Sequence, residues 1–172
     1  MRRVLLLSIH PRYTDSILSG TKTVELRRTR PRVQPGDSVL IYASSPVKAI
    51  VGGFVVDGLI QAQPAGLWDR VKHLAGVSQA EYDGYFSGVA VGYGIRIAHP
   101  WRLPDPVGLE ALRARRPSFR PPQSYSYLLA DDDLLPSAPD SHAPAIDRST
   151  ECGGCPPELR RESTGKGLAG LE

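Results

Sequence analysis

Hydrophobic residues follow three patterns along the first part of the chain, and each pattern predicts a different element. RRVLLLSI, residues 2–9, is an unbroken apolar run that predicts a buried strand. HPRYTDSILSG, residues 10–20, follows as a short helix, because Pro11 suits a first helical turn and Gly20 suits a helix end. KTVELRR, residues 22–28, alternates apolar and polar positions and predicts a half-buried strand.

Two further strands are expected after a turn. QPGD, residues 34–37, combines proline and glycine in the order that favours a turn. SVLIYA, residues 38–43, then predicts a third strand, and VKAIVGGFVVDGLI, residues 47–60, a long fourth one. The adjacent Gly52 and Gly53 predict a bulge or a sharp bend within this fourth strand.

The middle of the chain changes to helical periodicity before strands return. PAGLWDRVKHLAG, residues 64–76, has one apolar face and predicts an amphipathic helix. SQAEYDGYF, residues 78–86, opens with Ser78 and Glu81 at the spacing of a capping box, and its aromatic residues are expected to face the core. The next segments predict a curved strand, a basic helix and a closing strand, at residues 88–103, 107–117 and 118–129.

Strands separated by short helices, with many glycine bends, predict an α+β fold. The expected architecture is a small, closed, mixed β-barrel with helices on its flanks. This domain is expected to occupy residues 1–130. Residues 131–172 show no periodicity and are rich in proline, glycine, serine and acidic side chains. Because such a composition cannot bury a core, they are expected to form a disordered acidic tail.

Charge divides the chain at the same place. The formal net charge of the 172 residues is +3. Residues 131–172 hold four Lys/Arg against nine Asp/Glu, whereas residues 1–130 hold seventeen against nine. A basic body with an acidic tail predicts a polyanionic partner, for whose surface the tail could compete. The alternative is a soluble protein with an arginine-rich surface.

Membrane and metal signals are weak. No apolar run approaches the roughly 18–20 residues that cross a bilayer, and MRRVLLLSI favours a strand over a signal peptide because no cleavage site follows it. The protein is therefore expected to be cytoplasmic. Cys152 and Cys155 have the spacing of half a zinc site or a redox pair, but two reduced thiols are the simpler interpretation. No metal or cofactor is predicted, and the oligomeric state stays open.

The candidate chemistry is concentrated in SGTKTVELRRTRPR, residues 19–32. Lys22 and Glu25 are expected to pair, either in a cleft or as an exposed ion pair on a solvated strand. Glu25 could accept hydrogen bonds from a base edge, and a desolvated Lys22 would have a lowered pKa that suits a general base. Guanidinium groups match phosphate geometry, which predicts a phosphate track along Arg27, Arg28, Arg30 and Arg32.

The motif residues resemble those of a known family. Gly20, Lys22, Glu25 and Arg27 reproduce the G-x-K-x-x-E-x-R pattern of ASCH domains, which belong to the PUA-like superfamily with the EVE and YTH domains. The order of elements, the PGD turn, VLIYASSP and the ending SFRPPQSYSYL are also similar to this family, over residues 2–129. The resemblance implies a small barrel with a cleft that associates with RNA or modified nucleotides.

The resemblance also suggests two alternative enzymatic activities. Small bacterial members are amidohydrolases of N4-acetylcytidine, which use a lysine, a threonine three positions later and a central glutamate. Lys22 matches that lysine and Glu81 is a candidate for the glutamate, but Glu25 stands where the threonine nucleophile would be. Some other ASCH proteins resemble ribonucleases, which keeps RNA cleavage as an alternative.

The sequence therefore predicts a nucleic-acid-binding module that holds RNA or a modified nucleotide in the barrel cleft, with binding favoured over catalysis. The alternative is a hydrolase of RNA or of a modified nucleoside, with Lys22 as base and Glu25 as its partner. A weaker alternative is a DNA-binding regulatory accessory. RNA or another single-stranded nucleic acid is the expected partner, with DNA as an alternative and no membrane partner. The predicted nucleic-acid contacts are Lys22, Glu25, Arg27, Arg28, Arg30, Ser44, Ser45, Lys48, Gln123, Ser124 and Tyr125.

Overall fold

The computed structural model describes residues 3–135. The chain divides into two units, 1–137 and 138–172, and the second lies outside the described residues. The helices and strands of the described part are β1 (Arg3–Ile9), α1 (Pro11–Leu18), β2 (Val24–Arg27), β3 (Ser38–Ala43), β4 (Ala49–Ala62), α2 (Pro64–Val71), α3 (Gln79–Phe86), β5 (Gly92–Gly108), α4 (Leu109–Arg115) and β6 (Tyr125–Leu129).

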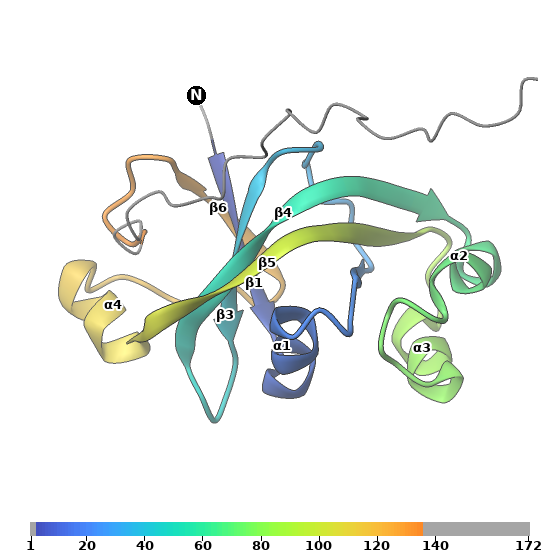
Figure 1. Cartoon of the computed structure of the whole chain (residues 1–172), viewed down its shortest axis with the longest axis horizontal. Coiled ribbons are helices and arrows are strands. Elements are labelled where there is room, and N and C mark those ends of the chain that lie inside the picture. Colours follow the sequence, from blue (N-terminus) through green and yellow to red (C-terminus); the bar gives the residue numbers. More distant parts are fainter. Residues whose placement is uncertain (1–2, 136–172) are drawn as a thin grey trace, which may run out of the picture. The chain divides into compact units, whose positions relative to one another are not determined.

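The strands form one mixed, six-stranded sheet in the order β2-β5-β4-β3-β1-β6. β1 pairs in parallel with β3, and the other neighbouring strands are antiparallel. β4 and β5 are the longest strands and curve together toward α2 and α3, which connect them (Figure 1). The predicted α+β class, with a mixed sheet and short flanking helices, is confirmed.

Tyrosine side chains tie β6 to the chain that follows β2, although β2 and β6 are opposite ends of the sheet order. The hydroxyl of Tyr127 accepts a hydrogen bond from the backbone N–H of Arg32 at 2.6 Å. The hydroxyl of Tyr125 donates one to the carbonyl of Arg30 at 3.0 Å. Alternate residues of a strand share a face, so both tyrosines act on the same side of β6. The segment after β2 is therefore held in place from two points.

Gly52 and Gly53 lie at the predicted bulge. The pairing of β4 shifts register with β3 and with β5 around these residues. A Cβ on Gly53 would lie 2.2 Å from the carbonyl oxygen of Val39 and 2.7 Å from the ring of Trp101. Glycine therefore lets β4 approach its neighbours closely where it bends.

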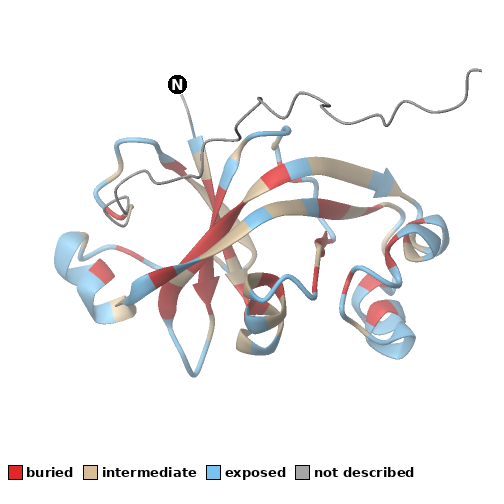
Figure 2. Cartoon of the chain, in the orientation of Figure 1, coloured by how far each residue is buried: buried red, intermediate tan, exposed pale blue. Residues whose placement is uncertain are grey.

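Buried residues form three hydrophobic clusters. Figure 2 shows that buried positions occur both on the strands and on the helices that pack against them. The first includes residues of α1, the second Leu112 of α4, and the third residues of α2 and α3. Of the predicted aromatic stripe, Tyr82 and Phe86 are buried in the third cluster, whereas Tyr85 is 39 % exposed. The three helical regions thus cover different parts of the sheet, and α3 leaves one tyrosine beside the site described below.

The helix predicted over 64–76 ends early, at Val71. After this end the carbonyl of Leu74 accepts hydrogen bonds from the backbone N–H groups of Thr23 and Val24, at 2.9 and 3.2 Å. The chain after α2 is therefore bonded to the start of β2. Local periodicity does not reveal these bonds to a distant segment.

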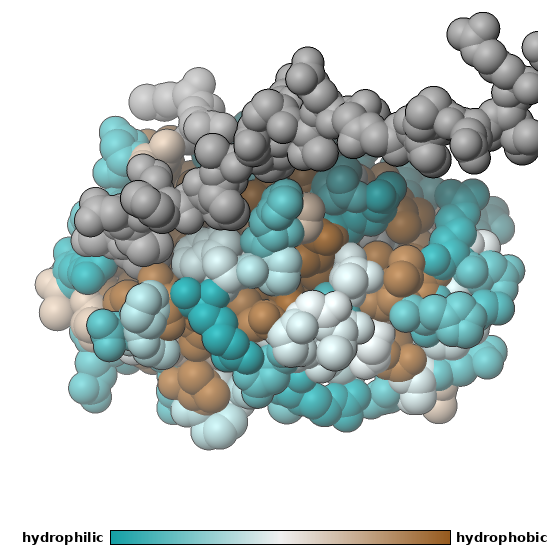
Figure 3. All heavy atoms as spheres, in the orientation of Figure 1, coloured by the Kyte–Doolittle hydropathy of each residue, from teal (hydrophilic) through white to brown (hydrophobic). Residues whose placement is uncertain are grey.

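Residues 131–135 pack on the domain, since Leu134 is buried in the second cluster and Asp132 pairs with Arg116 at 2.7 Å. The rest of the predicted tail, with Cys152 and Cys155, lies outside the described residues. The tail's disorder and the domain boundary at residue 130 therefore stay predictions. Within 3–135, no helix has the length and hydropathy of a membrane span. On the face that Figure 3 shows, hydrophilic and hydrophobic side chains are interspersed.

Candidate functional site

A cavity of about 280 Å³ lies at the end of β1, where residues of α1, β2 and α3 meet. Its wall includes three charged residues of the sequence motif and three tyrosines. We call this cavity the buried-charge pocket. Its lining residues are Ser8, Ile9, His10, Tyr13, Lys22, Glu25, Leu26, Arg27, Val77, Glu81, Tyr82 and Tyr85.

Lys22, Glu25 and Arg27 form one charged cluster in this pocket. Lys22 Nζ lies 3.3 Å from Glu25 Oε2, and Arg27 Nη2 lies 3.1 Å from Glu25 Oε1. The three side chains are only 2 %, 9 % and 7 % exposed. The predicted Lys22–Glu25 pair is present, and the alternative of an exposed pair on a solvated strand is wrong. The prediction of a half-buried strand is also wrong, because the polar side chains of β2 face protein groups instead of solvent.

Lys22 Nζ is surrounded by oxygen acceptors. It donates hydrogen bonds to the carbonyl of Val24, at 2.8 Å, and to the carbonyl of Ala75, besides its contact with Glu25. Burial lowers the pKa of Lys22, and the nearby Glu25 carboxylate opposes this shift. Two carbonyls and one carboxylate match the three N–H donors of an ammonium group. The geometry therefore stabilises the charged form of Lys22.

The cluster holds two cations against one carboxylate. Both oxygens of Glu25 are occupied, one by Lys22 and one by Arg27. Because buried charge without a counter-ion is costly, this cluster favours a negatively charged ligand. Two buried polar atoms, Ser8 Oγ and Arg27 Nε, have no hydrogen-bond partner among residues 3–135. Such atoms are uncommon in folded proteins, and a bound water or ligand would supply the missing partners.

Three tyrosines complete the wall. Lys22 Nζ lies 5.5 Å from the centroid of the Tyr13 ring, within the range of a cation–π contact. Burial raises the pKa of Tyr82 to about 12, and its hydroxyl donates to the carbonyl of Pro64 at 2.8 Å. Burial also raises the pKa of Tyr85, with the Arg27 cation opposing the shift. Aromatic faces beside positive charge are the combination that single-stranded nucleic acids require.

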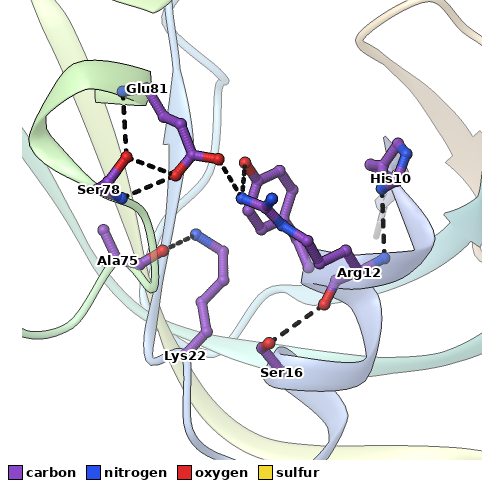
Figure 4. A network of polar contacts seen from close by, with 8 residues as sticks. His10, Arg12, Ser16, Lys22, Ala75, Ser78 and Glu81 are labelled. Carbon is purple, nitrogen blue, oxygen red and sulfur yellow. Dashed lines mark hydrogen bonds and ion pairs between the residues drawn. The ribbon is translucent and has the colours of Figure 1, made fainter. Parts of the chain in front are cut away.

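Glu81 links α3 to α1 at the rim of the pocket (Figure 4). The backbone N–H and the hydroxyl of Ser78 both donate to Glu81 Oε2 at 2.8 Å, which confirms the predicted capping box. The other carboxylate oxygen pairs with Arg12, whose guanidinium also donates to the hydroxyl of Tyr13 at 2.8 Å. These bonds, led by that from the Ser78 backbone, lower the pKa of Glu81 to about 2.

Replacing Glu81 with glutamine is expected to lower the melting temperature at neutral pH and to have little effect in strong acid. The pKa of Glu81 is 4.5 ordinarily and about 2 in the folded chain. The carboxylate therefore stabilises the fold fully above pH 4.5, and this contribution is lost as the pH falls toward 2. Thermal unfolding of both proteins across this range measures the effect. A difference in melting temperature that stays constant with pH would contradict it, and Glu110→Gln on α4 is the matched control.

The arginines of the motif are spread along the chain instead of forming one cluster. Arg27 lies in the buried-charge pocket. Arg28 donates to the carbonyl of Ser87, just after α3, at 3.3 Å. Arg30 and Arg32 line a second, larger cavity. Of the predicted phosphate track, Arg27 therefore lines one cavity, Arg30 and Arg32 line another, and Arg28 lines neither.

Two predicted serines flank the end of β1. The backbone N–H of Ser44 donates to the carbonyl of Ile9 at 2.9 Å, and the carbonyl of Ser124 accepts from the backbone N–H of Ser8 at 3.0 Å. Ser8 and Ile9 line the pocket, so both serines are neighbours of it without lining it. Their contact with a ligand stays a prediction.

The structure does not bring the remaining predicted residues into the pocket lining. Ser45 and Lys48 are exposed in the turn between β3 and β4, and Gln123 is exposed before β6. Tyr125, expected to stack on or read a base, uses its hydroxyl to hold the carbonyl of Arg30. Within 3–135, no group of three or more His, Cys, Asp or Glu residues is placed to bind a metal ion. The pocket therefore offers charge, hydrogen bonds and aromatic faces.

Sequence reasoning missed His10 and Tyr13 as pocket residues. His10 is the N-cap of α1, where its Nδ1 accepts a hydrogen bond from the backbone N–H of Arg12 at 3.3 Å. This contact occupies Nδ1, whereas Nε2 has no hydrogen-bond partner among the described residues. A polar residue directly before Pro11 is a recognisable N-cap signal, but nothing local shows that it lies beside Lys22.

Comparisons with known proteins agree with this geometry. The ASCH domain model matches residues 7–99. An ASCH domain-containing ribonuclease of Zymomonas mobilis is 33 % identical over 133 residues, which cover 76 % of this chain and 88 % of the relative. The crystal structure of ASCH from Zymomonas mobilis superimposes with a TM-score of 0.70 at 31 % identity, covering 74 % of this chain and 88 % of that one.

A second crystal structure extends the match. It is a tyrosine-to-phenylalanine variant of the Zymomonas mobilis protein, and it gives a TM-score of 0.71 at 30 % identity, covering 75 % of this chain and 92 % of that one. Sequence and fold thus agree with these relatives over most of the described residues. The chain therefore belongs to the ASCH domain family.

Proposed function

We propose that this protein binds RNA in the buried-charge pocket and cleaves the strand there. The observation that carries the proposal is the buried cluster of Lys22, Glu25 and Arg27, in which two cations share one carboxylate. The relative named a ribonuclease supports RNA as the substrate class. It also favours cleavage, which the sequence analysis held as the alternative, over binding alone.

Cleavage of a phosphodiester by its own 2′-hydroxyl fits what the pocket offers. The 2′-oxygen forms a bond to the adjacent phosphorus and loses its proton to a base. The bond from phosphorus to the 5′-oxygen breaks, and an acid protonates the departing oxygen, which leaves a 2′,3′-cyclic phosphate. Negative charge develops on the phosphoryl oxygens, and fixed cations in a site with little water stabilise it. DNA lacks the 2′-hydroxyl, so only RNA can be cleaved in this way.

The donor geometry supports a charge-stabilising role for Lys22 over the role of general base. A neutral amine in this place would direct its lone pair toward Glu25 after donating to the carbonyls of Val24 and Ala75. Glu25 orients Lys22 and Arg27, and the positive charge of both side chains would stabilise the phosphate through space. His10, at the rim, is the candidate for proton transfer, since histidine is the side chain most often used for this purpose.

An assay with the purified full-length protein tests this function. A short labelled RNA is incubated beside an oligonucleotide of the same sequence in which every 2′-hydroxyl is replaced by hydrogen. We expect cleavage of the RNA alone, with a 2′,3′-cyclic phosphate at the new end. Failure to cleave RNA, or equal cleavage of the deoxy strand, would refute the proposal. A preparation of the Lys22→Met variant, purified in parallel, detects contaminating ribonuclease.

A further inference from the structure

The second cavity lies at the other end of β1 from the buried-charge pocket. It has a volume of about 940 Å³ and includes Arg3 and Leu5 of β1, whereas the first cavity includes Ser8 and Ile9 of the same strand. Its remaining wall comes from the segment after β2 and from Tyr127 of β6. We call this cavity the arginine groove, after Arg3, Arg30 and Arg32.

The arginine groove carries an excess of positive charge. Its three arginines are exposed, and none of them forms an ion pair with another residue in the range 3–135. Asp37 is the one acidic residue of the lining, and its Oδ2 accepts a hydrogen bond from the backbone N–H of Gln34 at 2.9 Å within the turn. Three free guanidinium groups around one cavity favour phosphate groups, which their planar donor geometry fits.

The groove is held in a fixed shape by the tyrosines of β6. Tyr125 binds the backbone of Arg30 and Tyr127 binds the backbone of Arg32, so both arginine side chains remain free while their main chain is anchored. Arg3 places its guanidinium 5.3 Å from the centroid of the Tyr127 ring. Because these contacts exist before any ligand binds, less conformational entropy is lost on binding.

The two cavities are joined by one stretch of chain. Lys22, Glu25 and Arg27 line the first, and Arg30 and Arg32 line the second. The five residue steps from Arg27 to Arg32 span at most about 17 Å when extended. A linear polyanion that occupies the first pocket can therefore continue into the second, while one nucleotide would not fill both.

We propose that the arginine groove is a second phosphate-binding subsite, which holds the single-stranded RNA flanking the phosphate in the buried-charge pocket. The inference rests on the proposed function of that pocket. A cavity of about 280 Å³ has room for a single nucleotide but not for a duplex. The strand that enters it must therefore be unpaired. The flanking phosphates then meet Arg30 and Arg32, with Arg3 across the groove.

The double variant Arg30→Ala/Arg32→Ala tests the subsite without disturbing its backbone anchors, which are main-chain atoms. Fluorescence anisotropy with a labelled single-stranded RNA should show weaker binding, by roughly tenfold in low salt. The slope of log K against log salt should become shallower by roughly 1.4, because two phosphate contacts on a single strand are lost. Cleavage of a dinucleoside monophosphate, which reaches only the buried-charge pocket, should stay unchanged. The control is Arg70→Ala/Lys72→Ala on α2, which removes the same charge outside both cavities.

The outcomes separate this inference from the proposed function. Unchanged oligonucleotide affinity and salt slope in the double variant would overturn the subsite and leave the cleavage proposal intact. Equal weakening in the α2 control would also overturn it, because net charge alone would then explain the loss. If the wild type cleaves no RNA but the double variant still binds it less well than the control, the cleavage proposal fails and the subsite stands. A double variant that weakens binding of duplex RNA instead of single strands would overturn the assignment of a single strand.

Discussion

Replacing Lys22 with methionine is expected to lower the rate of RNA cleavage by about 100-fold, because it removes one of the two fixed positive charges that stabilise the transition state. Methionine is close to the lysine side chain in length and fills the buried space beside Tyr13 and Gly76. The variant leaves Glu25 paired with Arg27 alone, so the cluster of three charges loses its excess positive charge. The assay is single-turnover cleavage of a labelled RNA by wild type and variant.

Two further proteins make this result interpretable. Lys72→Met removes an exposed lysine of the same type, just after α2, and should cleave RNA at the wild-type rate. Arg27→Met removes the other cation and leaves the carbonyl contacts of Lys22 intact, so it should also lose cleavage. Circular dichroism establishes that each variant is folded. A folded Lys22→Met protein that cleaves RNA within about threefold of the wild type would refute the role of the buried cation.

Local patterns in the sequence predict most elements of the fold, because each short segment carries its own periodicity. The apolar run of β1, the capping box of α3 and the bulge at Gly52 all depend on neighbouring residues. The segment after α2 is held instead by Thr23 and Val24, some fifty positions earlier in the chain, which bind the carbonyl of Leu74. Contacts with such distant partners do not appear in a local pattern.

The candidate site shows the same division. The opposite charges of Lys22 and Glu25, close together in the sequence, predict that they pair, but alternation of polar and apolar residues predicts solvent on the polar face. Burial of that face comes from side chains of other elements, including Tyr13 of α1. The arginine groove is even harder to predict from the sequence. Antiparallel pairing of β1 with β6 brings Arg3, near the start of the chain, close to Tyr127, which lies near the other end of the domain.

Replacing Glu25 with glutamine is expected to destabilise the fold more than any single change to its two cationic partners. Glutamine keeps the size of the side chain but leaves Lys22 and Arg27 as two buried cations without a counter-charge. Removing one member of a buried ion pair typically costs about 3–5 kcal/mol of unfolding free energy. Urea denaturation measures this loss. The matched control is Asp57→Asn, which breaks an exposed pair with Arg96 and should cost about 1 kcal/mol or less.

Anions should restore part of the stability lost in Glu25→Gln, because they replace the missing negative charge. Sulfate or phosphate that binds only the folded state raises its stability by an amount that grows with ligand concentration. We therefore expect sulfate to raise the melting temperature of Glu25→Gln more than that of the wild type, with sodium chloride at equal ionic strength as the reference. Adding Lys22→Met to Glu25→Gln should also recover stability, since one buried cation then remains instead of two. If Glu25→Gln is as stable as the wild type, or gains no more from sulfate than the wild type does, then the three residues do not form an anion-binding cluster of unbalanced charge.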